Sequence, residues 1–118
     1  MWLLALALVI AGVAWLIMAP IKPGKLDSFA SCIKNSGATF YGAFWCSHCQ
    51  KQKAMFGRSS KLLPYVECSA SDGKSQLLIC TEAGISGYPT WQFPDGTRET
   101  GEISLTRLAE KTACELSQ

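Results

Sequence analysis

Two cysteines separated by two residues, Cys46 and Cys49, are the side chains whose type and spacing most directly predict chemistry in this sequence. They stand where a buried strand is predicted to turn into a helix, at the N-terminus of that helix. Unpaired backbone N–H groups and the helix dipole favour a negative charge there. We therefore expect a lowered thiolate pKa at Cys46, which makes it the nucleophile, and we expect Cys49 to resolve the mixed disulfide that forms.

His48 lies between the two cysteines. A protonated imidazole would add positive charge beside the Cys46 thiolate and would stabilise the reduced protein. Because a stabilised reduced form makes the disulfide a stronger oxidant, His48 favours disulfide donation over reduction. The alternative is a solvated helix residue that takes no part in the chemistry.

A Cys-x-x-Cys pair is also half of a structural zinc site. Such a site needs two more ligands, and the other cysteines form no second pair with this spacing. We therefore expect no metal. A binding function is the alternative to an enzyme: the chain would then be a membrane-tethered copper or zinc carrier that uses Cys46, His48 and Cys49.

The cysteine content indicates an oxidising compartment. Six cysteines in 118 residues exceed ordinary cytosolic usage, and an even number in a small domain predicts disulfides. Buried free thiols are the alternative for the four cysteines outside the close pair. The net charge is +2 and the charged residues are scattered, so we expect no binding to nucleic acid.

Residues 1–20 are predicted to be a transmembrane signal anchor, because Trp2 to Ala19 include no charged or strongly polar side chain. This run is near the lower limit for a helix that crosses about 30 Å of hydrocarbon. The alternative is a cleaved signal peptide, which the missing basic start and cleavage site disfavour. A linker over 21–26 and a folded domain over 27–118 follow.

The orientation signals disagree. Lys22 and Lys25 follow the predicted span, and the positive-inside rule alone would leave the domain in the cytoplasm. Two lysines are a weak bias, whereas six cysteines are a strong one. We therefore expect a single-pass membrane protein with an extracytoplasmic domain, in a periplasm or a compartment like the thylakoid lumen.

Helices and strands alternate along the predicted domain, which indicates an α/β fold with parallel pairing early and an antiparallel hairpin near the end. Asp27 or Ser28 is expected to cap the first helix, Gly57 to end the second and Ser104 to cap the last. Helices are expected over 27–35, 47–56, 75–83 and from 104 onward, and strands over 38–45, 64–68, 90–93 and 97–100.

The cysteine motif and a second motif together carry a family resemblance. Phe44-Trp45-Cys46-Ser47-His48-Cys49, followed by Gly87-Tyr88-Pro89-Thr90, resembles thioredoxin. A closer similarity is to the thioredoxin-like domain fused to vitamin K epoxide reductase homologues in bacteria and plants, and it covers roughly residues 27–113. The segments that carry it are 40–46, 50–53, 56–57, 65–68 and 87–91.

The resemblance implies a thioredoxin-like fold, with a central mixed sheet of about four strands flanked by helices and without thioredoxin's first strand. It implies that Pro89 is cis and packs beside the cysteine pair. It also implies that the backbone near Tyr88 and Thr90 pairs with an extended substrate, while Trp45 flanks the reactive sulfur. No cofactor is implied beyond the redox-active disulfide.

The fused relatives imply partners as well. In such fusions the domain passes electrons from folding proteins to a membrane-embedded enzyme that reduces quinone. We therefore expect cysteine-containing protein substrates and a separate quinone reductase of the vitamin K epoxide reductase type, near which the N-terminal span holds the domain. The expected activity is that of a membrane-anchored thiol–disulfide oxidoreductase working as an oxidant; a reductase of the same fold is the alternative.

The sequence departs from thioredoxin at the site. Ser47 and His48 replace the Gly-Pro of thioredoxin, and Phe40 stands six residues before Cys46, where thioredoxin has a buried Asp. The usual proton acceptor for Cys49 is therefore missing, and another group or water must serve. This departure favours oxidation or isomerisation over efficient reduction.

The other cysteines are expected to form structural disulfides. Cys68 ends a strand and Cys80 lies in the next helix, and the resemblance also points to a bridge between them. Cys32 and Cys114 then pair by elimination. Because the first and last helices of thioredoxin lie on opposite faces of the sheet, this second bridge needs the C-terminal tail to wrap; otherwise Cys114 is a free thiol or an intermolecular link.

Side-chain packing is predicted at a few further positions. Trp91 and Phe93 alternate on a strand and are expected in the core, and Met55 is expected there too. The basic residues of 51–61 are expected to form a solvated helix face.

Overall fold

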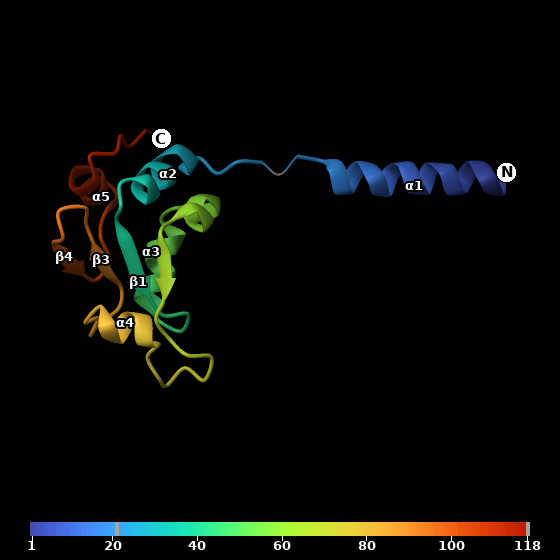
Figure 1. Cartoon of the computed structure of the whole chain (residues 1–118). Coiled ribbons are helices and arrows are strands. Elements are labelled where there is room, and N and C mark those ends of the chain that lie inside the picture. The colour runs from blue at the N-terminus through green and yellow to red at the C-terminus, as the bar shows by residue number, and fades with distance from the viewer. Residues whose placement is uncertain (21, 118) are drawn as a thin grey trace.

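The computed structural model describes residues 1–20 and 22–117. Residues 21 and 118, the first of the predicted linker and the last of the predicted domain, lie outside the described residues. The first helix, α1 (Trp2–Met18), extends away from the folded part of the chain (Figure 1), and all its side chains are exposed.

In the described part of the chain, no helix is both long enough and apolar enough to cross a bilayer. The transmembrane helix predicted over 1–20 is therefore not found. Helix α1 contains 17 residues, whereas a span takes about 20, and it ends because Ala19, which precedes a proline, is extended.

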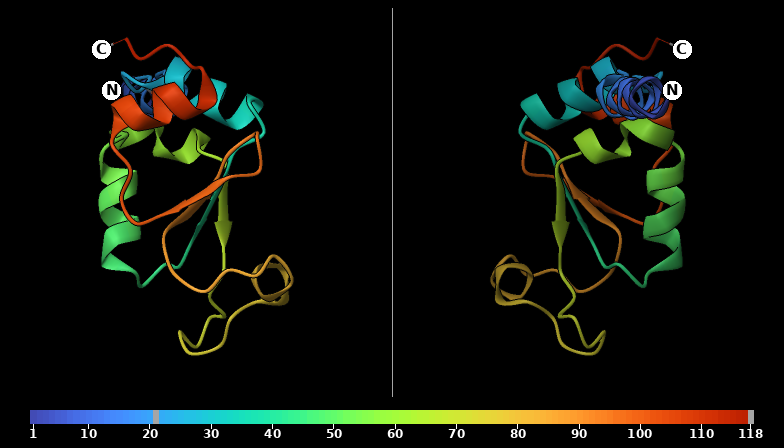
Figure 2. Two further views of the ribbon diagram at one scale, coloured as in Figure 1. Left: turned by 90° about the vertical axis from the view of Figure 1, so that its left-hand side faces the viewer. Right: turned by 90° about the vertical axis from the view of Figure 1, so that its right-hand side faces the viewer.

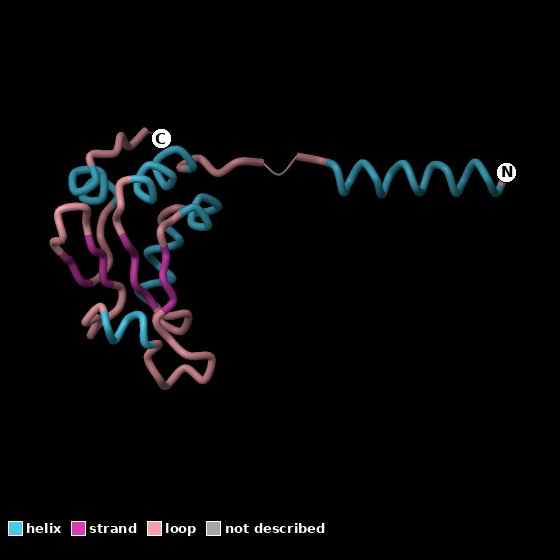
Figure 3. The backbone as a smooth tube through the Cα atoms, in the orientation of Figure 1, coloured by secondary structure: helices cyan, strands magenta, loops and turns pink. Residues whose placement is uncertain are grey.

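The folded part combines one small sheet with helices around it, and loops make up much of the rest (Figure 3). The helices are α2 (Asp27–Asn35), α3 (Ser47–Ala54), α4 (Leu78–Glu82) and α5 (Leu105–Thr112), with a 3-10 helix η1 (Gly57–Leu62). The strands are β1 (Thr39–Gly42), β2 (Tyr65–Glu67), β3 (Thr90–Gln92) and β4 (Arg98–Thr100).

The sheet has the order β2-β1-β3-β4. Strand β1 pairs in parallel with β2, in a register that sets Phe40 beside Tyr65 and Gly42 beside Glu67. Strands β1 and β3, and β3 and β4, pair antiparallel. This mixed four-stranded sheet confirms the predicted thioredoxin-like α/β fold.

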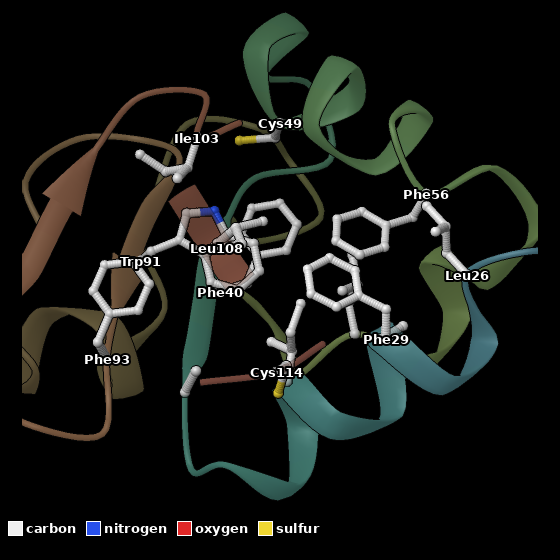
Figure 4. Close-up of a cluster of buried hydrophobic side chains, with 14 of the residues drawn as sticks. Leu26, Phe29, Phe40, Cys49, Phe56, Trp91, Phe93, Ile103, Leu108 and Cys114 are labelled. Atoms are coloured by element: carbon white, nitrogen blue, oxygen red, sulfur yellow. The ribbon is translucent and has the colours of Figure 1, made fainter. Parts of the chain in front are cut away.

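Helices cover the sheet on two faces (Figure 2). Because side chains alternate along a strand, Phe40 enters the larger core while Tyr41 packs on the smaller cluster around Cys68, Cys80 and Ile85. In the larger core, the Phe40 ring stacks on Trp91 with ring centroids 4.7 Å apart (Figure 4).

The two disulfides are Cys32–Cys114 and Cys68–Cys80, the pairs expected from the sequence. For the first bridge, the expectation that the C-terminal tail must wrap around the sheet is wrong. Helices α2 and α5 pack against each other and share the larger core, so the tail after α5 reaches Cys32 directly.

Several predicted element ends are wrong for local reasons. Neither Asp27 nor Ser28 is the N-cap of α2; Leu26 is, and the Asp27 carboxylate instead accepts hydrogen bonds from the Gly24 N–H and the Ser59 hydroxyl. Gly57 does not end α3 directly; its positive φ of 55° lets the chain start η1.

Helix α4 is shorter than the predicted 75–83 because the preceding residues form a turn. The Asp72 carboxylate accepts the N–H groups of Lys74 and Ser75, and Ser69 bridges to Gln76. The expected cap of the last helix is confirmed, since the Ser104 hydroxyl accepts the Arg107 N–H at 3.1 Å.

Core packing confirms Trp91 and Phe93, which are 0% and 2% exposed, and corrects Met55, which is exposed. The inward position of α3 is taken by Gln52. Its amide accepts from the Trp91 indole N–H and the Ile103 N–H, and it donates to the Ile103 carbonyl. A polar side chain is stable there because all these bonds are made.

Candidate active site

The free cysteines, Cys46 and Cys49, lie at the start of α3, shortly after the end of β1. Cys46 is the N-cap residue of α3, and its sulfur accepts the Cys49 backbone N–H at 3.2 Å. A tight turn, closed by a hydrogen bond from the Cys46 N–H to the Ala43 carbonyl, sets this position. The Cys46 sulfur therefore faces a backbone donor at the positive end of the helix.

The two thiols sit in different surroundings. Cys49 is 1% exposed and Cys46 is 7% exposed. Burial, reinforced by the hydrogen bond and charge of Cys46, raises the pKa of the Cys49 thiol to about 12, against a smaller opposing effect of Lys53. Cys49 therefore keeps its proton at neutral pH, and Cys46 is the more accessible of the two sulfurs.

The loop before β3 closes the site from the other side. The Tyr88–Pro89 peptide bond is cis, and the Cys46 thiol donates to the Tyr88 carbonyl at 3.7 Å. The Trp45 ring meets the Tyr88 ring edge-on, with centroids 5.9 Å apart. The structure thus brings Trp45, Tyr88 and Pro89 to the cysteine pair.

Thr90 stabilises this loop. Its side chain is buried, and its hydroxyl donates to the Gly87 carbonyl at 2.6 Å. Within the sheet Thr90 is paired with Tyr41 on one side and Thr100 on the other, and its hydroxyl holds the loop that carries Pro89.

His48 has a partner that sequence reasoning missed. Its Nδ1 lies 2.7 Å from a carboxylate oxygen of Glu102, in the segment between β4 and α5. The imidazole is largely exposed, and this contact holds it at the rim of the site. No local signal links two residues so far apart in the chain.

Among residues 1–20 and 22–117, no group of three or more His, Cys, Asp or Glu side chains is arranged to hold a metal ion. Within the Cys-Ser-His-Cys motif, the Nδ1 of His48 is engaged by Glu102. This arrangement offers no support to the copper or zinc alternative.

A second group that sequence reasoning missed lies beside Cys49 on β2. The Tyr65 hydroxyl donates to one oxygen of Glu67 at 3.2 Å, and the other oxygen accepts the N–H groups of Phe44 and Ser69. The Lys53 ammonium lies 3.6 Å from the centre of the Tyr65 ring. Burial and the charge of Glu67 raise the pKa of Tyr65 above its ordinary value.

Two groups of exposed apolar side chains lie next to Cys46 in the sequence and at the start of α4. Phe44 and Trp45 precede Cys46, while Leu77, Leu78 and Ile79 begin α4. A chain of contacts links the two groups. Gln76, which precedes Leu77, donates its amide N–H to the Tyr88 hydroxyl at 2.6 Å, and the Tyr88 ring contacts the Trp45 ring. A partner that reaches Cys46 therefore meets the exposed Phe44 and Trp45 rings.

The chain is similar to known thiol–disulfide enzymes, although no family model matches it. It is 46% identical over 95 residues to the thiol-disulfide oxidoreductase LTO1 of Arabidopsis thaliana, which covers 77% of this chain and 25% of that protein. It is 37% identical over 78 residues to the protein disulfide isomerase-like 2-1 of Oryza sativa subsp. japonica, covering 63% of this chain and 21% of that protein.

A third relative, the probable protein disulfide-isomerase A6 of Medicago sativa, is 35% identical over 84 residues, covering 68% of this chain and 23% of that protein. The chain spans about a quarter of the length of the curated relatives it matches.

Fold, site and similarity together define the class: the chain contains a thioredoxin-like domain. Its relatives are named as a thiol–disulfide oxidoreductase and disulfide isomerases, which supports thiol–disulfide oxidoreductase activity for this domain. Proteins of this type work through redox-active cysteines and need no cofactor, in agreement with the sequence.

Proposed function

We propose that the chain exchanges disulfides with cysteine-containing proteins through Cys46 and Cys49, and that it works as an oxidant. One observation carries the proposal: Cys46 stands at the N-terminus of α3, where its sulfur accepts the Cys49 N–H and lies beside the Tyr88 carbonyl. The remaining four cysteines are paired in disulfides, which leaves this pair for exchange.

The oxidising reaction moves two electrons from a client dithiol to the cysteine pair. A client thiolate attacks the Cys46 sulfur, the Cys46–Cys49 bond breaks, and Cys49 leaves as an anion that takes up a proton. The second client thiolate then attacks the client sulfur of the mixed disulfide. The client disulfide forms, and Cys46 departs as a thiolate.

The client is an extended polypeptide segment. Its thiols must be accessible, which is the condition of a chain that has not finished folding, and such a chain also exposes apolar side chains. The apolar surface formed by Phe44, Trp45 and the first turn of α4 supports binding of that kind. The backbone of Tyr88 is the edge against which the segment would extend.

The chain works at a membrane, beside a quinone-dependent enzyme of the vitamin K epoxide reductase type that reoxidises the pair. The support for a membrane contact is α1, whose side chains are apolar and exposed. The two structural disulfides support an extracytoplasmic, oxidising location for the domain. The quinone-dependent partner rests on the sequence resemblance to the fused domains.

Trapping experiments test the exchange reaction. The oxidised protein is mixed with a reduced, unfolded disulfide protein, and client disulfides are counted with a thiol reagent and by mass. Cys46→Ala should abolish transfer, because it removes the sulfur that the client attacks. Reduced Cys49→Ala should accumulate a Cys46–client mixed disulfide when mixed with oxidised client, because the resolving thiol is gone.

Ser47→Ala is the matched control, since it changes the same motif without removing a sulfur, and it should retain transfer. Trapping through Cys49 in the Cys46→Ala variant, at a rate like that of the wild type, would contradict the assigned roles. The reduction potential of the pair separates oxidant from reductase: a value near −120 mV supports the oxidant, and one near −270 mV favours a reductase.

A further inference from the structure

The chemistry of Cys49 requires a proton to move at a buried sulfur. When Cys49 resolves a mixed disulfide its S–H must lose a proton, and when the Cys46–Cys49 bond breaks its sulfur must regain one. Phe40 fills the space beneath the motif with an apolar ring, stacked on Trp91 and edge-on to Tyr65. The group that handles the proton must therefore come from another element.

Because Gly42 has no side chain, two groups can approach the same point of β1. A Cβ atom at Gly42 would lie 3.1 Å from the Cys49 sulfur and 3.4 Å from the Tyr65 hydroxyl oxygen. The thiol and the hydroxyl thus lie close to the same point; no direct hydrogen bond joins them, and they are within reach of each other through one water molecule. The β1–β2 register creates this arrangement, because it pairs Gly42 with Glu67 and Phe40 with Tyr65, and residues two apart on a strand share one face of the sheet.

The far side of the Tyr65 hydroxyl is connected to solvent. It donates to Glu67, whose carboxylate is held by the Phe44 and Ser69 N–H groups and is only partly buried. The titratable groups facing Cys49 and Tyr65 are Cys46 and Lys53 from α3 and Glu67 from β2. His48 is turned to Glu102 and takes no part.

We propose that Tyr65, held by Glu67, carries the proton of Cys49 during disulfide exchange, a step that rests on the function proposed above. In resolution, the Cys49 proton passes to the Tyr65 oxygen while the Tyr65 proton passes to Glu67. The Cys49 thiolate attacks Cys46, the Cys46–client bond breaks, and the client thiolate leaves. Glu67 then returns its proton to water or to the departing thiolate, and the path runs backward when the pair is the oxidant.

Two-phase kinetics test this assignment. Reduced protein is mixed rapidly with an aromatic disulfide whose thiol is coloured. The first, concentration-dependent release reports attack by Cys46, and the second, concentration-independent release reports resolution by Cys49. Tyr65→Phe keeps the ring beside Gly42 and under Lys53 and removes only the hydroxyl. It should slow the second phase at pH 7 by about 10-fold or more and leave the first within about 2-fold.

The pH profile separates proton transfer from mere packing. The defect of Tyr65→Phe should shrink as the pH rises, because hydroxide then removes the Cys49 proton directly. Glu67→Gln, whose amide oxygen can still accept hydrogen bonds, should show the same pattern, and it serves as the second variant if Tyr65→Phe does not fold. Tyr41→Phe, on the opposite face of the sheet, is the matched control and should match the wild type in both phases.

Three results would overturn the assignment. An unchanged second phase in both folded variants would exclude the proton-transfer role of Tyr65 and Glu67 and would leave the proposed function intact. Slowing by the same factor at every pH assigns the two residues to packing. If the wild type itself gives no first phase, Cys46 is not a nucleophile, and the proposed function falls together with this step.

Discussion

The two active-site cysteines differ in what surrounds each sulfur. The Cys46 sulfur accepts a backbone N–H and borders the Tyr88 carbonyl, and Cys46 is the less buried of the two cysteines. The Cys49 sulfur is buried, and its burial disfavours the charged form. This asymmetry assigns the reaction with the client to Cys46. At Cys49 it makes the loss and gain of a proton the difficult step.

The raised pKa of Cys49 predicts an alkaline loss of stability in the reduced protein. An unfolded thiol titrates near 8.5, so above that pH the unfolded chain releases a proton that folded Cys49 retains. The contribution is fully present below pH 8.5 and declines toward pH 12, at up to about 1.4 kcal/mol per pH unit. Denaturant unfolding of reduced wild type and reduced Cys49→Ala, from pH 7 to 10.5, measures the difference.

The oxidised protein is the control, because its Cys49 cannot titrate and the alkaline decline should be smaller. Parallel pH profiles for reduced wild type and Cys49→Ala would show that Cys49 ionises as easily in the fold as in the unfolded chain.

Among the elements, β1 and β2 decide what lies beneath the active site. Their parallel register puts Tyr65 beside Phe40 and Glu67 beside Gly42, while α3 packs over the same face. The close approach requires glycine at position 42, because a Cβ there would lie 2.8 Å from the Tyr65 ring. The contact between strand and helix is therefore tight at one residue.

Gly42→Ala should destabilise the reduced protein by about 1–3 kcal/mol, because the added methyl overpacks the contact with Tyr65 and Cys49. Gly87→Ala is a suitable control for stability, since a Cβ there would meet Thr100 at 3.4 Å, an ordinary contact. Urea unfolding midpoints measure both. Equal losses for the two variants would mean that the space at Gly42 can expand without strain.

At the scale of the whole molecule, two disulfides secure a sheet of short strands. Cys32–Cys114 joins α2 to the tail that follows α5, across 82 residues of sequence. Cys68–Cys80 closes 12 residues and fixes α4, with its exposed apolar turn, against the end of β2. The first bridge constrains the unfolded chain far more than the second.

Removing each bridge by paired alanine substitutions should therefore cost different amounts. The chain-entropy relation gives about 4.5 kcal/mol for Cys32–Cys114 and about 3 kcal/mol for Cys68–Cys80. Guanidinium unfolding of the two double variants, compared with the wild type, measures the ranking. A larger loss for the Cys68–Cys80 pair would show that the native contacts of α4, and not loop entropy, dominate.

The sequence by itself determined the features that depend on neighbours in the chain. The Cys46–Cys49 spacing at a helix start, the Ser104 cap and the alternation of helices and strands follow from local geometry, and the structure has them. The motif around Pro89 was recognised from its resemblance, because no local rule distinguishes this proline from others. Element ends were less predictable where side chains such as Asp27 found partners outside their own helix.

The tertiary structure alone decided which distant residues meet. Strand register brought Tyr65 and Glu67 to Cys49, and the segment between β4 and α5 brought Glu102 to His48. These contacts join residues far apart in sequence, and they depend on which strand pairs with which and on how helices pack. Spacing and periodicity describe a few neighbouring residues and carry no information about such pairings.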